Sequence, residues 1–435
     1  MTYLDTDKQT KADLSIVEGV YDEYPLFSLF SGTETKNGKL LMLDWVTSPL
    51  SDISAIRKRQ EAIAWQELPD LPLDEEELDF IEYYLEYRDQ IQRPNVLVSL
   101  TTAFDRYFRH DSKRYVITRG VTLIIRLVHQ LLLLQKNTPG NAPLLLKELA
   151  QNVHEAIYSS ELQEVISLHK NEERALSNYT IDKLDYLFRC VRLDTIRELL
   201  SNVYLLDVCR TAHQVAINRN FCSLPEMVQT MEFSISGFVH PFVKQGQVND
   251  WKMSGKSICI FTGSNMAGKS TTLKAITTAV WLAHCGLPVP AHSMTCPVFG
   301  GIYTSINLPD SLRDGRSHFM AEILRIKEVL RKAKSGNRCM IILDEMFRGT
   351  NAQDAFEASV AVNNLLKEYQ HCSFLISTHI LEYAKNFEKD DACCFYYMDS
   401  KIEEGHFICP YRLVEGISET KVGYWLVKKE LKDLI

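Results

Sequence analysis

One short stretch in the middle of the chain restricts the possible folds more than any other feature. The apolar run ICIFT at residues 258–262 leads into GSNMAGKS at residues 263–270, and a helix-like pattern follows directly. A G-x-x-x-x-G-K-[ST] loop between a strand and a helix is the arrangement in which backbone N–H groups surround phosphate oxygens. A glycine-rich turn with a chance lysine is the alternative, which this context disfavours. We therefore expect a P-loop nucleoside-triphosphate-binding domain here.

The loop residues have separate physical roles. Gly263 and Gly268 let the backbone curl so that successive N–H groups point inward, and the dipole of the following helix adds positive potential there. Lys269 is expected to reach the β- and γ-phosphates of ATP, and Ser270 is expected to ligate Mg²⁺.

Two further apolar runs end in polar residues that suit a phosphate site. MIILDE at residues 340–345 places Asp344 and Glu345 at the carboxyl end of a buried strand, where parallel sheets bind ligands. We expect Asp344 to hold Mg²⁺ through water and Glu345 to act as the general base. A helix N-cap or a solvated carboxylate is the alternative for Asp344 alone. FLISTH at residues 374–379 predicts His379 as a γ-phosphate sensor, with a structural or merely exposed histidine as the alternative.

The pattern after about residue 231 alternates between short apolar runs and helical stretches, which predicts a mostly parallel sheet with helices on both faces. The expected strands are 257–261, 299–306, 339–343, 372–377 and 393–398, and the expected helices lie near 268–284, 317–335, 351–369 and 420–433. We expect the last strands, within 393–409, to form an antiparallel hairpin at the edge of the sheet.

Residues 1–230 have helical periodicity with few breakers, so the fold class is an N-terminal all-α domain (1–230) followed by an α/β P-loop domain (231–435). The helical half carries a net charge of −9 and the rest +1. Neither half is therefore basic enough to indicate nucleic-acid binding through phosphate neutralisation. The best local candidate for phosphate contact is RYFRHDSKRYVITR at residues 106–119, and a solvated helix face is an equally good interpretation.

Three features bear on location. Eleven cysteines lie between Cys190 and Cys409 without any C-x-x-C pair, which is typical of a reducing compartment. The polar N-terminus does not resemble a signal peptide. The most apolar run, residues 121–134, contains Arg126 and His129 and is too short and too charged to span a bilayer. We therefore expect a cytoplasmic protein with no membrane partner.

Four motifs resemble those of the MutS family, the DNA mismatch-recognition ATPases. The family fingerprint reads TGPNMGGKST, then GxSTFMxE, then hhhhDExGRGTS, then THxxEL. This chain has, in the same order, TGSNMAGKST (262–271), GRSHFMAE (315–322), MIILDEMFRGTN (340–351) and STHILEYA (377–384). Residues 37–65 and 205–227 are similar to the opening of the family's core domain and the end of its lever helix. The resemblance covers about residues 25–430 and is strongest after residue 255.

The resemblance implies an ABC-type ATPase in which two subunits enclose ATP and Mg²⁺. Ser317 matches the residue that contacts the partner's γ-phosphate, although a simple helix N-cap also explains a serine there. Asn265 matches a loop position that orients the γ-phosphate or water, with an Asx turn as the alternative. The implied ATP-binding residues are Gly263, Ser264, Asn265, Met266, Ala267, Gly268, Lys269, Ser270, Thr271 and, from the partner, Ser317; the catalytic ones are Glu345, Lys269 and His379.

The chain also departs from the family pattern. Ala267 and Phe347 replace glycines, and His318 replaces a threonine. We expect the mismatch-reading and connector domains to be absent and the DNA-clamping insertion to be reduced or absent.

Three functions remain open. The first is a dimeric ATPase coupled to DNA, related to mismatch repair, to other DNA repair or to recognition of DNA structure. The second is an ATP-driven switch of the same fold that binds a protein partner, which the acidic helical half and the missing reader favour. The third is a nucleotide binder with little turnover, which Phe347 beside the acidic pair suggests and the presence of Lys269, Asp344 and Glu345 disfavours. We favour the first, with a homodimer as the expected assembly.

Overall fold

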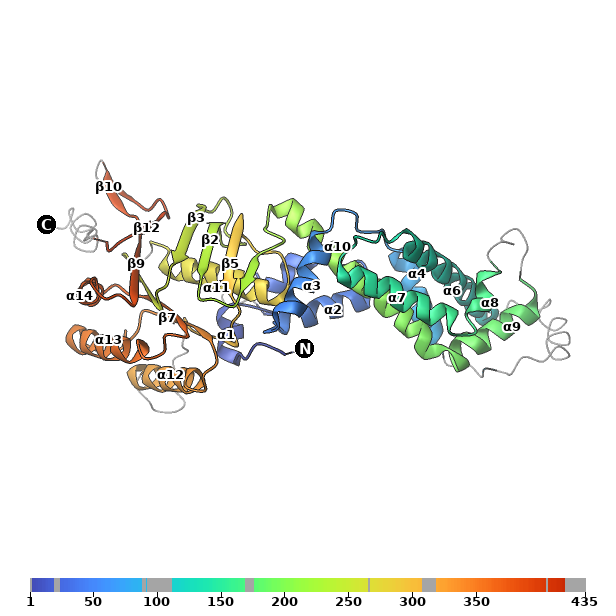
Figure 1. The fold of residues 1–435 in the computed structure, drawn as a ribbon, viewed down its shortest axis with the longest axis horizontal. Helices are drawn as coiled ribbons and strands as arrows, with labels where there is room; N and C mark the ends of the chain where they lie inside the picture. Colours follow the sequence, from blue (N-terminus) through green and yellow to red (C-terminus); the bar gives the residue numbers. More distant parts are fainter. Residues whose placement is uncertain are drawn as a thin grey trace. The chain divides into compact units, whose positions relative to one another are not determined.

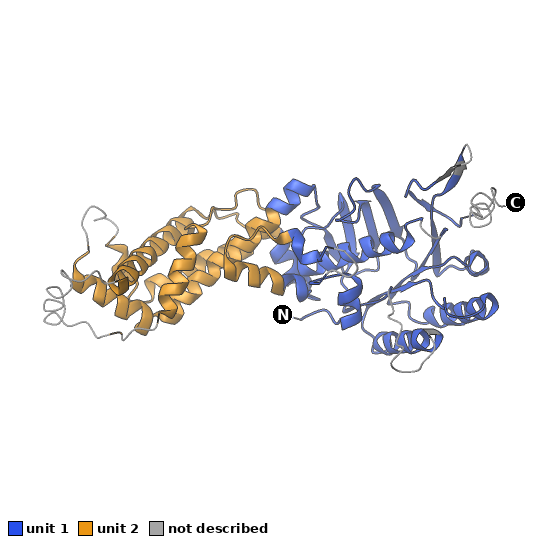
Figure 2. Ribbon diagram, turned by 180° about the vertical axis from the view of Figure 1, so that it is seen from behind, with its two compact units in different colours: residues 1–29, 45–60, 214–435 blue, residues 30–44, 61–213 orange. Residues whose placement is uncertain are grey.

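The computed structural model describes residues 2–18, 24–87, 91, 112–168, 176–264, 267–306, 318–403 and 406–418 (Figure 1). The chain forms two compact units (Figure 2). One contains residues 1–29, 45–60 and 214–435, and the other contains residues 30–44 and 61–213. These units group residues by packing, so the expected domain division after residue 230 stays a prediction.

The second unit is all helical, which confirms the predicted class of the N-terminal half. Its elements are α4 (Glu75–Glu86), α6 (Ser112–Asn137), α7 (Leu144–Tyr158), α8 (Gln163–Ile166), α9 (Asn178–Tyr186), the π-helical turn η3 (Leu187–Val191), and parts of α2 (Lys36–Thr47), α3 (Ile53–Ala64) and α10 (Leu193–Arg219). Apolar residues at helical spacing fill one core, among them Ile81, Ile124, Val128, Ile157 and Leu199. Asp74 and Glu77 form a capping box at the start of α4.

A buried polar network ties α4 to η3 inside this core. The Tyr84 hydroxyl donates to Asp185 at 2.7 Å, and Arg189 pairs with the same carboxylate through two N–H groups at 2.7 and 2.6 Å. Gly120 on α6 makes room for the Tyr84 ring, since a Cβ there would lie 2.2 Å from it. The carboxylate and the guanidinium neutralise each other, as buried charges require.

Among the described helices, α6 alone is long and apolar enough to cross a membrane by length and composition. The sequence argument considered only residues 121–134, whereas the helix continues from 112 to 137. Its apolar face lies in the bundle core, and 56% of its most apolar window is buried. The core helix of a bundle passes the same test, so length and composition alone do not make α6 a membrane span. The absence of a membrane partner stays a prediction.

The first unit contains a six-stranded sheet in the order β12-β9-β4-β8-β7-β6. Its strands are β4 (Ile258–Thr262), β6 (Gly301–Ser305), β7 (Cys339–Asp344), β8 (Ser373–Ser377), β9 (Cys393–Met398) and β12 (Leu413–Glu415). All neighbours are parallel except β12, which runs antiparallel to β9. The predicted α/β class is therefore confirmed.

Helices cover this sheet as the alternating pattern predicted. They are α11 (Lys269–Cys285), α12 (His318–Ala333), α13 (Ala352–Leu366) and α14 (Leu381–Asn386). The helices α12, α13 and α14 share one apolar core with β4, β7 and β8. The helix α11 is buried along most of its length and contacts β7, β8 and β2. The last predicted helix, 420–433, lies outside the described residues.

The strands differ from the prediction in two respects: one sheet was missed, and the edge hairpin was predicted wrongly. A second sheet, in the order β1-β5-β2-β3, was not predicted; it consists of β1 (Glu226–Val228), β2 (Phe233–Phe238), β3 (Asn249–Met253) and β5 (Ser293–Pro297). In addition, β9 is not part of an edge hairpin but lies inside the large sheet, parallel to β4. In the described part of 393–409, the one hairpin is the separate pair β10 (Lys401–Glu403) and β11 (His406–Ile408). Because β9 follows α14, a crossover connection makes it parallel.

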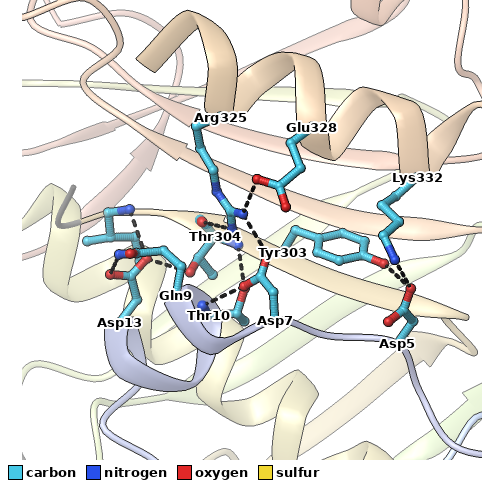
Figure 3. Close-up of polar contacts among 11 residues, drawn as sticks. Asp5, Asp7, Gln9, Thr10, Asp13, Tyr303, Thr304, Arg325, Glu328 and Lys332 are labelled. Carbon is cyan, nitrogen blue, oxygen red and sulfur yellow. Dashed lines mark hydrogen bonds and ion pairs between the residues drawn. The ribbon is translucent and has the colours of Figure 1, made fainter. Parts of the chain in front are cut away.

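The N-terminal segment, residues 2–16, covers the free edge of β6 (Figure 3). Asp5 forms a parallel bridge with Gly301, and α1 (Lys8–Asp13) follows it. Outward N–H groups of the β6 edge, at Ile302, Thr304 and Ile306, donate to the Asp5 carbonyl, the Thr10 hydroxyl and the Asp13 carboxylate, respectively. The segment therefore supplies the partners that an edge strand otherwise lacks.

Candidate functional site

The loop between β4 and α11 has the backbone that its glycines predict. Gly263 has φ +141° and Gly268 has φ +98°, both in the region that favours glycine. A Cβ on Gly268 would lie 3.2 Å from the Tyr411 ring. The Ala267 N–H donates to the Ser264 carbonyl at 3.2 Å and closes the turn. Asn265 and Met266 lie outside the described residues.

Lys269 is the first residue of α11 and is buried. Its ammonium donates to the carbonyls of Gly263 and Ser264 at 2.8 and 3.1 Å. It also pairs with Glu345 Oε1 at 3.2 Å. The lysine therefore lies across the loop that it follows, with its charge balanced by Glu345.

Ser270 and Asp344 meet as the sequence predicted for a Mg²⁺ site. The Ser270 hydroxyl donates to Asp344 Oδ2 at 2.7 Å, and Ser377 from the neighbouring strand β8 donates to the other carboxylate oxygen. Burial raises the pKa of Asp344, although both serine hydrogen bonds and the Arg348 charge act in the opposite direction. Burial outweighs these effects, including that of the Arg348 guanidinium 3.8 Å away, so a cation at Asp344 would offset the cost of burying its charge. Carboxylate and hydroxyl oxygens are the ligands that Mg²⁺ prefers. These residues fit the metal.

Glu345 lies in a strained turn immediately after β7. Its φ is +46°, unusual for a non-glycine residue, and its N–H donates to both the carbonyl and the hydroxyl of Ser377 at 3.1 and 3.0 Å. The His379 ring, together with the Lys269 and Arg348 charges, lowers the pKa of Glu345 to about 2. The carboxylate is therefore ionised and held between cations.

Two side chains contact the Glu345 carboxylate from outside the phosphate loop: His379, which was predicted, and Arg348, which was missed. His379 Nδ1 lies 3.7 Å from Glu345 Oε2, and its side chain is 49% exposed, so it can still meet a ligand. Arg348 Nε lies 2.8 Å from the same oxygen. Arg348 and Ser377 had no assigned role in the sequence analysis, although both lie inside motifs quoted there, at residues 340–351 and 377–384.

Phe347, where the family has glycine, adopts the backbone conformation that glycine favours. Its φ is +65°, its side chain is 2% exposed, and its ring lies 5.3 Å from that of Phe319 on α12. Its N–H donates to the carboxylate of Glu322, also on α12. The sequence analysis missed Glu322, whose signal was its place at the end of the FMAE motif.

A cavity of about 290 Å³ opens beside the start of α11. Its walls include Phe238, Val243, Thr272, Met398 and Tyr411. Asn249 fixes one wall, because it donates to the Tyr411 carbonyl at 3.0 Å and accepts from the Leu413 N–H at 2.7 Å. Mostly apolar walls next to a phosphate loop suit a nucleobase. No motif marked these residues in the sequence.

Two further predictions lie outside the described residues: Ser317, and residues 106–111 of the basic stretch. In its described part, Arg114 pairs with Asp182, and the Arg119 guanidinium lies 4.7 Å from the centre of the Phe80 ring. Part of the positive charge is therefore balanced within the helical unit. The described residues hold no group of three or more histidine, cysteine or acidic side chains arranged for a metal ion.

Comparison with known proteins identifies the domain. Residues 259–430 match the family model "MutS domain V". The chain is 31% identical over 274 residues to the DNA mismatch repair protein MutS of Aquifex pyrophilus, which is 60% of this chain and 32% of that protein. The corresponding proteins of Petrotoga mobilis and Shouchella clausii are 31% and 29% identical over 51% and 54% of this chain, and 27% of each relative is covered. The matched region thus spans less than a third of each relative.

Proposed function

This chain belongs to the MutS family through its ABC-type ATPase domain, and we propose that it hydrolyses ATP and couples turnover to DNA. The observation that carries the proposal is the convergence of Lys269, Ser270, Asp344 and Glu345 at the carboxyl edge of one parallel sheet. Four residues from two motifs meet where phosphoryl transfer needs a cation, metal ligands and a base.

The chain's own residues divide the work of the reaction. The loop N–H groups bind the phosphates, and Lys269 exchanges its contacts with Gly263 and Ser264 for phosphate oxygens. The Ser264 hydroxyl is buried without a hydrogen-bond partner among the described residues, so it is available to a ligand. Ser270 and Asp344 hold Mg²⁺, which neutralises phosphate charge when bound. The nucleobase occupies the cavity beside Tyr411.

Glu345 becomes more basic when Lys269 exchanges its contact with Glu345 for the phosphates. It loses one of the cations that lower its pKa, so its carboxylate becomes a stronger base. It then accepts a proton from the attacking water. His379 donates to the γ-phosphate from its exposed position. Ser317 of a second copy completes the site, so ATP occupancy favours a closed homodimer.

DNA is the partner we propose first, because the relatives matched here are named DNA mismatch repair proteins. The test is steady-state phosphate release with linear, mismatched and branched DNA, in the wild type and in Glu345→Gln. Stimulation by one of these DNAs that is lost in Glu345→Gln supports the proposal. Turnover that no DNA changes, with no salt-sensitive DNA binding, contradicts the coupling.

A protein partner is the second candidate. The observation that favours it is the −9 charge of residues 1–230, together with the internal pairing of Arg114. Capture of a protein whose affinity changes with ATP and not with nuclease treatment would favour this candidate over DNA.

A further inference from the structure

We propose that Glu322 is a positioning residue for Glu345, and that α12 is the fixed support from which it acts. This inference rests on the proposed ATPase function and deepens it. Nothing in the phosphate-loop motif requires an acidic residue at this place, and Glu322 touches none of Lys269, Ser270 or Asp344 in the contacts described above.

The first step concerns the turn that carries Glu345. Glu345 and Phe347 both have positive φ, at +46° and +65°. Neither residue is glycine, so the turn is a high-energy backbone conformation that its surroundings must hold. Without such support the chain relaxes to φ below zero and the Glu345 carboxylate leaves its place.

The second step concerns the hydrogen bonds that hold the two ends of this turn. At the first end, the Glu345 N–H donates to Ser377 on β8. At the other end, the Phe347 N–H donates to the Glu322 carboxylate, which is buried. A buried backbone N–H that loses its acceptor is left unsatisfied, which is costly, so an acceptor oxygen at this position holds the turn. Glu322 therefore fixes the side of the turn that the sheet does not reach.

The third step shows why Glu322 does not simply move with the turn. Further along the same helix, Arg325 donates to the Asp7 carboxylate at 2.6 Å and to the Thr304 carbonyl at 2.7 Å. Lys332 reaches Asp5 at 2.9 Å. Figure 3 shows these side chains joining α12 to the N-terminal segment and to β6. Because α12 is anchored to the sheet edge, Glu322 is a fixed acceptor.

Three variants separate position from charge. Glu322→Gln keeps the length and an acceptor oxygen, Glu322→Asp keeps the charge and shortens the reach, and Glu322→Ala removes both. We expect Glu322→Ala and Glu322→Asp to lower kcat on the order of 10- to 100-fold, as misplacement of a catalytic group does. KM for ATP should change little, because the phosphate loop is untouched. Glu322→Gln should retain most of the wild-type kcat.

Lys327→Ala is the control, since it truncates an exposed side chain on the same helix and leaves Arg325, Lys332 and Glu322 in place. Its kcat should equal that of the wild type. Binding of a fluorescent ATP analogue and thermal unfolding are measured on every variant, so that loss of fold is separated from loss of positioning. Should Glu322→Ala fail to fold, the other two variants still test the proposal, because it predicts a higher kcat for Glu322→Gln than for Glu322→Asp.

The outcomes are distinct from those that test the proposed function. If the wild type releases no phosphate, the ATPase proposal itself fails. If the wild type turns over and Glu322→Asp retains full kcat while Glu322→Gln loses it, the charge of Glu322 matters and its reach does not, and the positioning role is wrong. Equal kcat in all variants overturns it as well.

Discussion

Replacing Phe347 tests the claim that its positive φ costs free energy and that burial of its ring offsets this cost. The ring is 2% exposed and lies against Phe319, and removing a buried phenylalanine costs about 3–5 kcal/mol. A non-glycine residue in the left-handed region costs about 1–2 kcal/mol. Phe347→Ala loses the ring and keeps the strain, so we expect destabilisation of about 3–5 kcal/mol.

Phe347→Gly loses the ring and relieves the strain. Glycine adds an entropic cost of about 0.5–1 kcal/mol relative to alanine. Subtracting this cost from the strain leaves Phe347→Gly more stable than Phe347→Ala by up to about 1.5 kcal/mol. Both variants remain less stable than the wild type.

The assay is urea unfolding followed by tryptophan fluorescence. Trp251 and Trp281 are fully buried in the same compact unit and report its unfolding. If Phe347→Ala proves more stable than Phe347→Gly, the backbone at this position is not strained and the reasoning is wrong. If neither substitution destabilises the unit, the ring does not contribute to its core.

Three other predictions concern the loop, the helical unit and the sheet edge. Gly268→Ala should weaken ATP binding measured by titration calorimetry, because φ is +98° and the new Cβ would lie 3.2 Å from Tyr411; unchanged affinity would count against the loop geometry. Asp185→Ala should destabilise the helical unit by about 3–5 kcal/mol in thermal unfolding, since Arg189 would stay buried without its partner, and Asp182→Ala, at a partly exposed ion pair, is the milder comparison. The pKa of Asp7 is lowered, because the hydrogen bonds and charge of Arg325 and Thr10 outweigh the raising effect of burial. Its stabilising contribution is therefore present above pH 3.8 and is lost as the pH falls below that value. The protection factors of the Ile302, Thr304 and Ile306 amides, which are corrected for the intrinsic pH dependence of exchange, should fall in that acid range. Protection factors that do not change with pH would refute the role of the segment.

The site was predictable where local chemistry dictates geometry. The pattern from Gly263 to Ser270 specifies its own turn, and an apolar strand ending in Asp344 and Glu345 must deliver both to the sheet edge. What the pattern could not show was how Lys269 and Glu345 pair in this structure, since that depends on two segments far apart in the sequence.

Other features depend on long-range packing. The strand β1 has only three residues. The strand β2 alternates between apolar and polar residues only over 233–236, before Gly237 interrupts it, which is a short pattern to detect. The bridge between Asp5 and Gly301 joins positions almost 300 residues apart, and no local periodicity indicates it. In the sequence, Phe347 was noted as a departure from the family and as a reason to consider low turnover. Its conformation follows from the partners Glu322 and Phe319, which the sequence could not bring together.

The central claim is that Lys269, Ser270, Asp344 and Glu345 form an ATP-hydrolysing site. The most direct test mixes the purified chain with Mg²⁺ and radiolabelled ATP and analyses the nucleotide that remains bound. The account predicts that the wild type releases phosphate and retains ADP, whereas Glu345→Gln binds ATP and holds it unhydrolysed. Hydrolysis by Glu345→Gln at the wild-type rate, or failure of the wild type to bind nucleotide, would contradict it.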